Sequence, residues 1–218
     1  GFKFEVYGNL NIQESNLDAL DADNPWQGIQ INPGGSIEIQ NTELNNCLTG
    51  LLIGNHTLEY VNNVHFSNME TGINLKTDYL ANYDYFGTLN ITNCQFDNIS
   101  NTAIDWSPDI DNPIFNEGWD QQGLLNVENC SFNTIAGTGI NIQGNTDWYY
   151  NGSLSVTNSS FINVTTAVSV IANIQHQYYW PAPDYQYWDD SWDPGLGLKN
   201  IISYNQFTNY TNAVITDG

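Results

Sequence analysis

The sequence predicts an all-β protein in which about seven short coils stack as a parallel β-solenoid, with residues 1–218 forming a single domain. Three observations lead to this prediction. A short unit is repeated along the chain, apolar and polar residues alternate within it, and the signals that start and stop helices are missing. β-Branched and aromatic residues fill the apolar positions, which favours strands over helices.

Each copy of the repeat is centred on one large apolar residue, which we call the anchor. The clearest copies are CQFDNISNTAIDW, which starts at Cys94, and CSFNTIAGTGINI, which starts at Cys130. Seven anchors can be aligned, and they are Leu17, Leu44, Phe66, Phe96, Phe132, Phe161 and Phe207. The shortest interval between anchors is 22 residues, so one coil is expected to contain about 22 residues.

The residues around the anchor predict short strands with one inward face. Apolar residues stand seven and five positions before it, as in Leu89 and Ile91, and three positions after it, as in Ile99. A small residue and an apolar residue follow, as in Gly72 and Ile73, and the small residue suits a tight bend. One copy cannot bury its inner face alone, so each copy must stack on its neighbours.

Asparagine recurs three positions before the anchor. The residues are Asn41, Asn63, Asn93, Asn129 and Asn158. We expect their side chains to point inward and to form a ladder, in which each amide bonds to the next copy and to turn backbone. On this expectation, Asn93→Ala removes about 1–3 kcal/mol of stability.

The repeat resembles that of the right-handed parallel β-helix, or pectin-lyase-like, proteins, and most of all the bacterial secreted and cell-surface kind. The resemblance is carried by WQGIQINPGGSIEIQNTELNNCLTGLLI, residues 26–53, and by the later N-x-x-F-x-x-[IV] units, and it covers almost the whole chain. It implies a right-handed parallel β-helix. It does not imply one function, because lyases, hydrolases, adhesins and passive spacers share this fold.

Most of the additional length between anchors falls at one turn, after the last strand of a coil. The inserts are residues 76–88, 107–124, 143–153 and 171–199. Because the coils stack in register, we expect these long aromatic and acidic inserts on one flank, where they form a contact surface. Its candidate residues are Trp119, Trp148, Tyr149, Trp180, Trp188 and Trp192. The alternative is a self-packed cluster that only orders the loops.

The charge balance limits the partners. The formal net charge is −21, from 24 acidic residues against three lysines and no arginine. Nucleic acid is excluded because nothing could neutralise its phosphates, and anionic membrane surfaces are disfavoured for the same reason. No apolar run approaches the roughly 20 residues that span a bilayer, so membrane insertion is not expected. Other copies of the chain, a longer parent chain or a polysaccharide are the expected partners.

Eight Asn-x-Ser/Thr sequons favour an extracellular or cell-surface location with N-linked glycans. The expected acceptors are Asn55, Asn90, Asn98, Asn151, Asn163 and Asn209. Three of them, Asn98, Asn163 and Asn209, stand two positions after an anchor and are expected to line one outer edge, with Thr134 at that position in another copy. Asn129 and Asn158 are excluded because they belong to the inward ladder.

Two acidic loops, DALDADN from Asp18 and DWSPDIDN from Asp105, offer the oxygen ligands that Ca²⁺ prefers. The candidate ligands are Asp18, Asp21, Asp23, Asp105, Asp109 and Asp111, and solvated acidic loops are the alternative. No cofactor is required.

Two cysteines, Cys94 and Cys130, share one position in consecutive copies. Strands about 4.8 Å apart allow a disulfide, but parallel in-register strands make its geometry awkward, so a bridge and free thiols both stay open.

The family resemblance makes polysaccharide degradation a function to test. The lyases pair calcium carboxylates with an arginine or lysine base, whereas this chain has no arginine and its three lysines lie far apart. Two of four hydrolase motifs are matched in letters only, at residues 145–147 and 189–190, and both lie in inserts. No catalytic residue is therefore predicted.

These observations predict a non-catalytic extracellular structural protein, a surface or filament building block that stacks end to end and is N-glycosylated. The strand pattern begins near Phe2 and ends at Thr216 without a capping helix, and a bare terminal coil is an unpaired edge. The alternatives are a carbohydrate-binding β-helix module and a polysaccharide lyase or glycoside hydrolase.

Overall fold

The computed structural model describes residues 1–19, 23–32, 35–54, 59–75, 88–106, 121–143, 150–171 and 201–217. In these ranges all regular structure is β, as predicted, and every strand pairing is parallel. None of these segments forms a helix that could cross a membrane.

The described residues contain fifteen strands, which belong to one curled sheet. They are β1 (Lys3–Val6), β2 (Asn9–Gln13), β3 (Asn16–Leu17), β4 (Gly28–Ile31), β5 (Ser36–Asn45), β6 (Thr49–Ile53), β7 (Glu59–Leu75), β8 (Thr88–Thr92), β9 (Gln95–Trp106), β10 (Gln121–Glu128), β11 (Ser131–Gln143), β12 (Tyr150–Thr157), β13 (Ser160–Ile171), β14 (Ile201–Ser203) and β15 (Gln206–Asp217).

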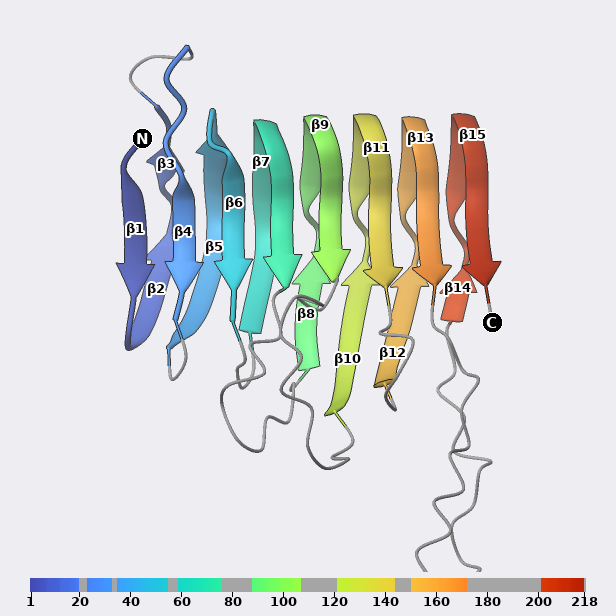
Figure 1. Ribbon diagram of the computed structural model, residues 1–218, viewed down its shortest axis with the longest axis horizontal. Helices are drawn as coiled ribbons and strands as arrows, with labels where there is room; N and C mark the ends of the chain where they lie inside the picture. The colour runs from blue at the N-terminus through green and yellow to red at the C-terminus, as the bar shows by residue number, and fades with distance from the viewer. Residues whose placement is uncertain are drawn as a thin grey trace, which may run out of the picture.

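Figure 1 shows how the sheet curls. The neighbouring strands β8, β10, β12 and β14 run upward in this view, whereas the arrowheads of the neighbouring strands β9, β11, β13 and β15 point downward. A sharp turn joins each strand of the first row to one of the second, as Asn93 and Cys94 join β8 to β9. The chain therefore wraps around the core as it passes from one row to the other.

The anchors pair with one another from strand to strand. Their order across the sheet is Leu17, Leu44, Phe66, Phe96, Phe132, Phe161 and Phe207, so the alignment made from the sequence is the register of the sheet. The four phenylalanines from Phe66 to Phe161 are fully buried. Their adjacent rings stack with centroids 4.5–4.9 Å apart and planes within 3°. Residues five and seven positions before the anchors, such as Leu89 and Ile91, line the same core.

The prediction of an inward asparagine ladder is wrong. Asn41, Asn63, Asn93, Asn129 and Asn158 are all exposed, and their φ angles lie between 49° and 56°. This is the left-handed region, which asparagine tolerates better than most residues with a side chain. The repeat therefore uses asparagine here for its backbone conformation. The amides still pair on the outside in places, since Asn63 Nδ2 donates to Asn41 Oδ1 at 2.8 Å.

The residue that points inward at this turn is the next one, two positions before the anchor. In five copies its hydroxyl or thiol donates to the carbonyl two residues earlier, at 2.8–3.3 Å. These residues are Ser15, Thr42, Cys94, Cys130 and Ser159. A left-handed residue thus bends the chain, and a short polar side chain closes the bend from inside.

A second column of left-handed residues lies two positions after the anchors. Asn46, Asn68, Asn98, Thr134, Asn163 and Asn209 have φ angles of 51–58°. Amides bond from copy to copy along this edge, as Asn98 Nδ2 does to Asn68 Oδ1 at 2.6 Å and Asn209 Nδ2 to Asn163 Oδ1 at 3.0 Å. Asn98, Thr134, Asn163 and Asn209 are exposed, which agrees with the outer edge expected from the sequence.

We expect Asn93→Ala to lose about 1 kcal/mol of unfolding free energy, because alanine is strained at a φ of 56°. The matched variant Asn93→Gly should be nearly neutral, because glycine adopts this conformation freely. Urea denaturation followed by circular dichroism measures both. Equal losses in the two variants would instead place the stabilisation in the bond from Asn93 Nδ2 to Asn62 Oδ1, which both variants lack.

Candidate functional site

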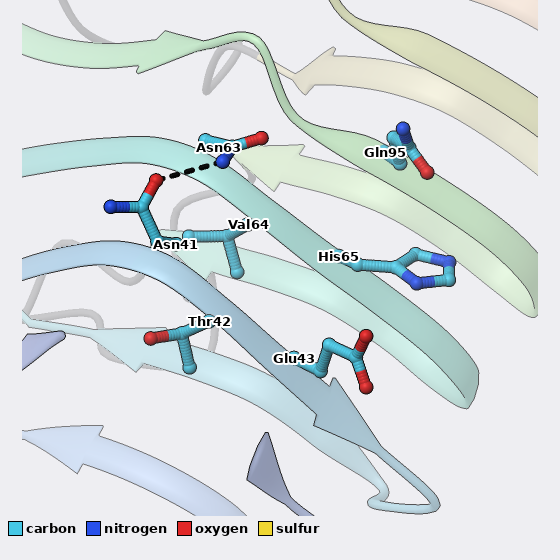
Figure 2. A pocket seen from close by; sticks show the side chains of 7 residues that line it. All are labelled: Asn41, Thr42, Glu43, Asn63, Val64, His65 and Gln95. Carbon is cyan, nitrogen blue, oxygen red and sulfur yellow. Dashed lines mark hydrogen bonds between the residues drawn. The ribbon is translucent and has the colours of Figure 1, made fainter. Parts of the chain in front are cut away.

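A shallow polar groove lies on the outside of β5, β7 and β9, and Figure 2 shows its side chains. It is lined by Asn41, Thr42, Glu43, Asn63, Val64, His65 and Gln95. At its border, His65 Nε2 lies 2.8 Å from Asp97 Oδ2. The Thr42 hydroxyl is buried and donates to the carbonyl of Gln40, so it is not placed as a nucleophile. The groove therefore offers an imidazole–carboxylate pair without an activated nucleophile.

The repeat pattern by itself did not indicate this pair. His65 precedes the anchor Phe66, and Asp97 follows the anchor of the next copy. Both side chains point outward from neighbouring copies of the repeat. Comparing diagonal outward positions of the aligned copies could therefore have predicted the contact between His65 and Asp97.

Only part of the two predicted calcium loops is described. Asp18 accepts hydrogen bonds from Asn46 Nδ2 at 2.8 Å and Asn45 Nδ2 at 3.2 Å, and Asp105 accepts one from Asn141 Nδ2 at 2.8 Å. Asp23 is exposed. Asp21, Asp109 and Asp111 lie outside the described residues. Within the described ranges, no group of three or more His, Cys, Asp or Glu side chains could hold a metal ion. Calcium binding stays a prediction.

The two cysteines whose pairing the sequence left open, Cys94 and Cys130, are free and buried, so no bridge is formed. Parallel strands in register point both side chains in the same direction, and each thiol donates instead to a backbone carbonyl, Thr92 O at 3.2 Å and Glu128 O at 3.3 Å. The neighbouring Cys130 thiol and then burial raise the pKa of Cys94. Burial raises the pKa of Cys47 to about 12.

The predicted glycan acceptors differ in position. Asn98, Asn163 and Asn209 are exposed, and Asn90 is half-buried. Asn151 lies in β12, but its side chain is not described. Asn55 lies outside the described residues altogether.

Two further sequons, Asn129 and Asn158, are exposed as well, so the reason for excluding them is wrong. The alignment placed these two side chains in the core, but the left-handed φ of each residue turns its side chain outward.

The six aromatic residues of the predicted contact surface lie outside the described residues. They are Trp119, Trp148, Tyr149, Trp180, Trp188 and Trp192. The strand ends that precede the inserts are described, and they are neighbours. Leu75 pairs with Trp106, Trp106 with Ile142, and the adjoining Gln143 with Ile171. The four inserts therefore begin at the carboxyl ends of neighbouring strands, on one side of the sheet.

Exposed large apolar side chains gather at the two ends of the sheet. Of the nine such residues in the described ranges, only Tyr60 and Ile162 belong to inner strands. The other seven are Phe2, Phe4 and Tyr7 at one end and Ile201, Tyr204, Tyr210 and Val214 at the other, and they are 41–85% exposed. The two ends are thus the apolar part of the described surface.

The strands at these ends have unpaired outer edges. Among the described strands, β1, β2 and β3 have no partner on the outer side at one end, and β14 and β15 have none at the other. β15 is twelve residues long, QFTNYTNAVITD, and only its last residue is charged. Proteins usually protect such edges with charges, proline or bulges, because unpaired N–H and C=O groups attract further strands. The two ends are therefore the candidate functional site.

Comparisons with known proteins identify no relative of this chain. No family model matches it, and no curated protein or solved structure is significantly similar to it.

Proposed function

We propose that the protein is a non-catalytic structural building block of an extracellular surface or filament, a right-handed parallel β-helix that stacks end to end. The observation that carries this proposal is the pair of open ends, where apolar side chains are exposed on strands without an outer partner. A second copy or a longer parent chain supplies both missing features at once, because either offers a parallel strand edge and apolar side chains at equivalent positions of the repeat.

The distribution of charge supports contact through the ends. A net charge of −21 opposes the approach of two copies side by side. β14 and β15 together contain a single charged residue, Asp217. At the other end, Lys3 Nζ lies 2.8 Å from Glu5 Oε1, so the charges of β1 compensate each other. Three of the outer strands, β1, β14 and β15, therefore contribute almost no net charge.

Assembly should depend on the end surface, and two equally exposed residues allow a matched test. Val214 in β15 and Tyr60 in β7 are both 41% exposed, but only Val214 lies at an end. We expect filaments or multimers of the unmodified protein in electron micrographs and in sedimentation. Val214→Glu should leave monomers, because a buried unpaired carboxylate is costly, whereas Tyr60→Glu should assemble normally.

Far-UV circular dichroism confirms that both variants fold. Monomers of the unmodified protein at high concentration, or equal loss of assembly in both variants, would contradict end-to-end stacking.

We further propose N-glycosylation along the outer column of Asn98, Asn163 and Asn209. In each of these sequons the hydroxyl residue is exposed too, as in Ser100, whereas Ser131 of the Asn129 sequon is half-buried. A glycosylated amide keeps one N–H, so a bond such as that from Asn98 to Asn68 can persist.

Mass spectrometry of glycopeptides from native material should find sugar on these three residues first. Sugar confined to Asn90, Asn129 and Asn158 would contradict the assignment, as would protein without any glycan.

A carbohydrate-binding module is the second candidate function. It is favoured by the neighbouring strand ends, on one side of the sheet, at which the four aromatic inserts begin. Tyr and Trp rings suit stacking on sugars. Binding on a glycan array that is lost in Trp188→Ala and Trp192→Ala would support this function.

A further inference from the structure

We propose that the buried thiols of Cys94 and Cys130 form a binding site for one soft monovalent cation of the Cu⁺ or Ag⁺ kind, which they hold between them. The site lies at the turns that join β8 to β9 and β10 to β11. Both ligands belong to inner copies of the repeat, so the inference is independent of the sheet ends and of the function proposed above.

The two cysteine side chains have equivalent contacts. Each thiol donates to the carbonyl two residues earlier, at 3.2 Å for Cys94 and 3.3 Å for Cys130. Each also donates to a carbonyl of the preceding copy, at 3.6 and 3.5 Å, and these carbonyls belong to the register partners Val61 and Ile91. Equivalent atoms of paired strands lie one strand spacing apart, so the two sulfur atoms are about 4.8 Å from each other.

This separation is too long for a disulfide, but it suits one ion between the two sulfur atoms. A disulfide needs its sulfur atoms about 2.05 Å apart. Zinc, as an example of ion size, bonds a cysteine sulfur at about 2.3 Å, so two sulfur atoms on opposite sides of one such ion lie about 4.6 Å apart. The parallel in-register geometry that leaves the thiols unbridged therefore places them where one ion fits.

The ligands select a soft cation of low coordination number. Thiolates favour Cu⁺, whereas Ca²⁺ and Mg²⁺ prefer oxygen ligands. Structural zinc takes four ligands. In the described part of the chain, no group of three or more His, Cys, Asp or Glu side chains could hold a metal ion, so the two thiols have no further side-chain ligand of these types there. Cu⁺ and Ag⁺ accept two sulfur ligands in a line and need no third.

The site has room for one ion and stays neutral when the ion is bound. Cys94 and Cys130 are 1% and 3% exposed, and their neighbours in the column, Val64 and Ser159, are buried and carry no thiol. When the ion binds, one S–H proton leaves to solvent and the other thiol keeps its proton. One thiolate, one thiol and one monovalent cation are neutral together, which avoids the cost of an unpaired buried charge.

The column offers a matched pair of test variants, because Ser159 continues it. The residues on both sides of Cys130 pair in register with those on both sides of Ser159, whose hydroxyl donates to the carbonyl two residues earlier at 3.0 Å. Cys94→Ser/Ser159→Cys therefore moves the thiol pair one copy along and keeps about 4.8 Å between the sulfur atoms. Cys130→Ser/Ser159→Cys has the same number of thiols but separates the pair by two strand spacings, or about 10 Å.

The experiment titrates each protein with Ag⁺ in chloride-free buffer. Native mass spectrometry gives the stoichiometry, competition with a chelator gives the affinity, and circular dichroism checks folding and gives the midpoint of thermal unfolding. The unmodified protein and Cys94→Ser/Ser159→Cys should bind one ion per chain, and their midpoints should rise because the ion binds the native state. Cys94→Ser and Cys130→Ser/Ser159→Cys should bind at least about a hundredfold more weakly.

Two controls test the identity of the site and of the ion. Cys47→Ala should bind Ag⁺ like the unmodified protein, because the Cys47 thiol is not one of the two ligands. Cu⁺, kept reduced, should displace Ag⁺, whereas Zn²⁺ should not. Displacement by Zn²⁺, or none by Cu⁺, would overturn the assignment to a soft monovalent cation.

Two results would overturn the shared site. Equal affinity of the two double variants would mean that the distance between the thiols does not matter. A lower unfolding midpoint of the unmodified protein with Ag⁺ would mean that the ion prefers thiols of the unfolded chain.

Discussion

Replacing Phe96 with alanine is expected to lower the unfolding free energy by about 3–5 kcal/mol. Phe96 is fully buried between Phe66 and Phe132, with ring centroids 4.8 and 4.9 Å away and planes within 3°. The variant loses two stacking contacts, each worth about 0.5–1.5 kcal/mol, and leaves a cavity. The cavity cannot collapse, because the ladders on both sides of β9 hold its neighbours β7 and β11 at a fixed spacing.

Phe207→Ala is the matched control, because it removes the same anchor from the end copy. Phe207 is only partly buried, and its one stacked neighbour among the described residues, Phe161, is 5.3 Å away at 16°. Its loss should be about half that of Phe96→Ala, since less apolar area returns to water. Urea denaturation followed by circular dichroism measures both variants. Equal losses would mean that depth within the stack does not control stability.

Gly28→Ala is expected to have the second large effect. Gly28 has a φ of 99°, and a Cβ atom there would lie 1.6 Å from the backbone oxygen of Thr49. Backbone strain and steric overlap each cost about 1–3 kcal/mol. The atom in the way belongs to the backbone, so no side-chain rotation relieves the overlap. β4 would have to move away from β6, and the pairing of β1 with β4 would weaken with it.

Gly8→Ala is the control for this prediction, because a Cβ atom at Gly8 would meet nothing within 4 Å. It should change the unfolding free energy by less than about 0.5 kcal/mol. Thermal unfolding followed by circular dichroism compares the two variants. A Gly28→Ala protein as stable as Gly8→Ala would show that the start of β4 adopts another conformation in solution.

The repeated apolar positions were enough to predict the strand register. The repeat aligns Phe96 with Phe132, and these residues are register partners in the sheet. The physical reason is that equivalent apolar side chains must be buried together, and only parallel in-register stacking does this for every copy.

The asparagines show where this reasoning fails. A recurrent asparagine favours both a buried amide ladder and a left-handed turn, so its recurrence does not distinguish them. Glu14 and Tyr204, which stand at the same position in the first and last copies, were the available signal, because neither suits a buried amide column. Both have left-handed φ angles, 49° and 58°.

An irregularity in spacing was also visible in the sequence. Phe96 stands seven residues before Ala103, whereas Phe66 stands six before Gly72. The additional residue produces the register shift between β7 and β9, next to Met69. A bulge absorbs it, so the apolar positions on both sides stay in register.

By itself, therefore, the sequence determined the all-β class, the parallel register and the buried anchors, because these follow from apolar residues at equivalent positions. The tertiary structure alone decided which way the turn residues face, that Cys94 and Cys130 stay free, and that His65 meets Asp97. It also decided where apolar side chains stay exposed and which strand is outermost. These features depend on backbone dihedrals and on contacts between neighbouring copies, and a one-dimensional pattern of residue types contains neither.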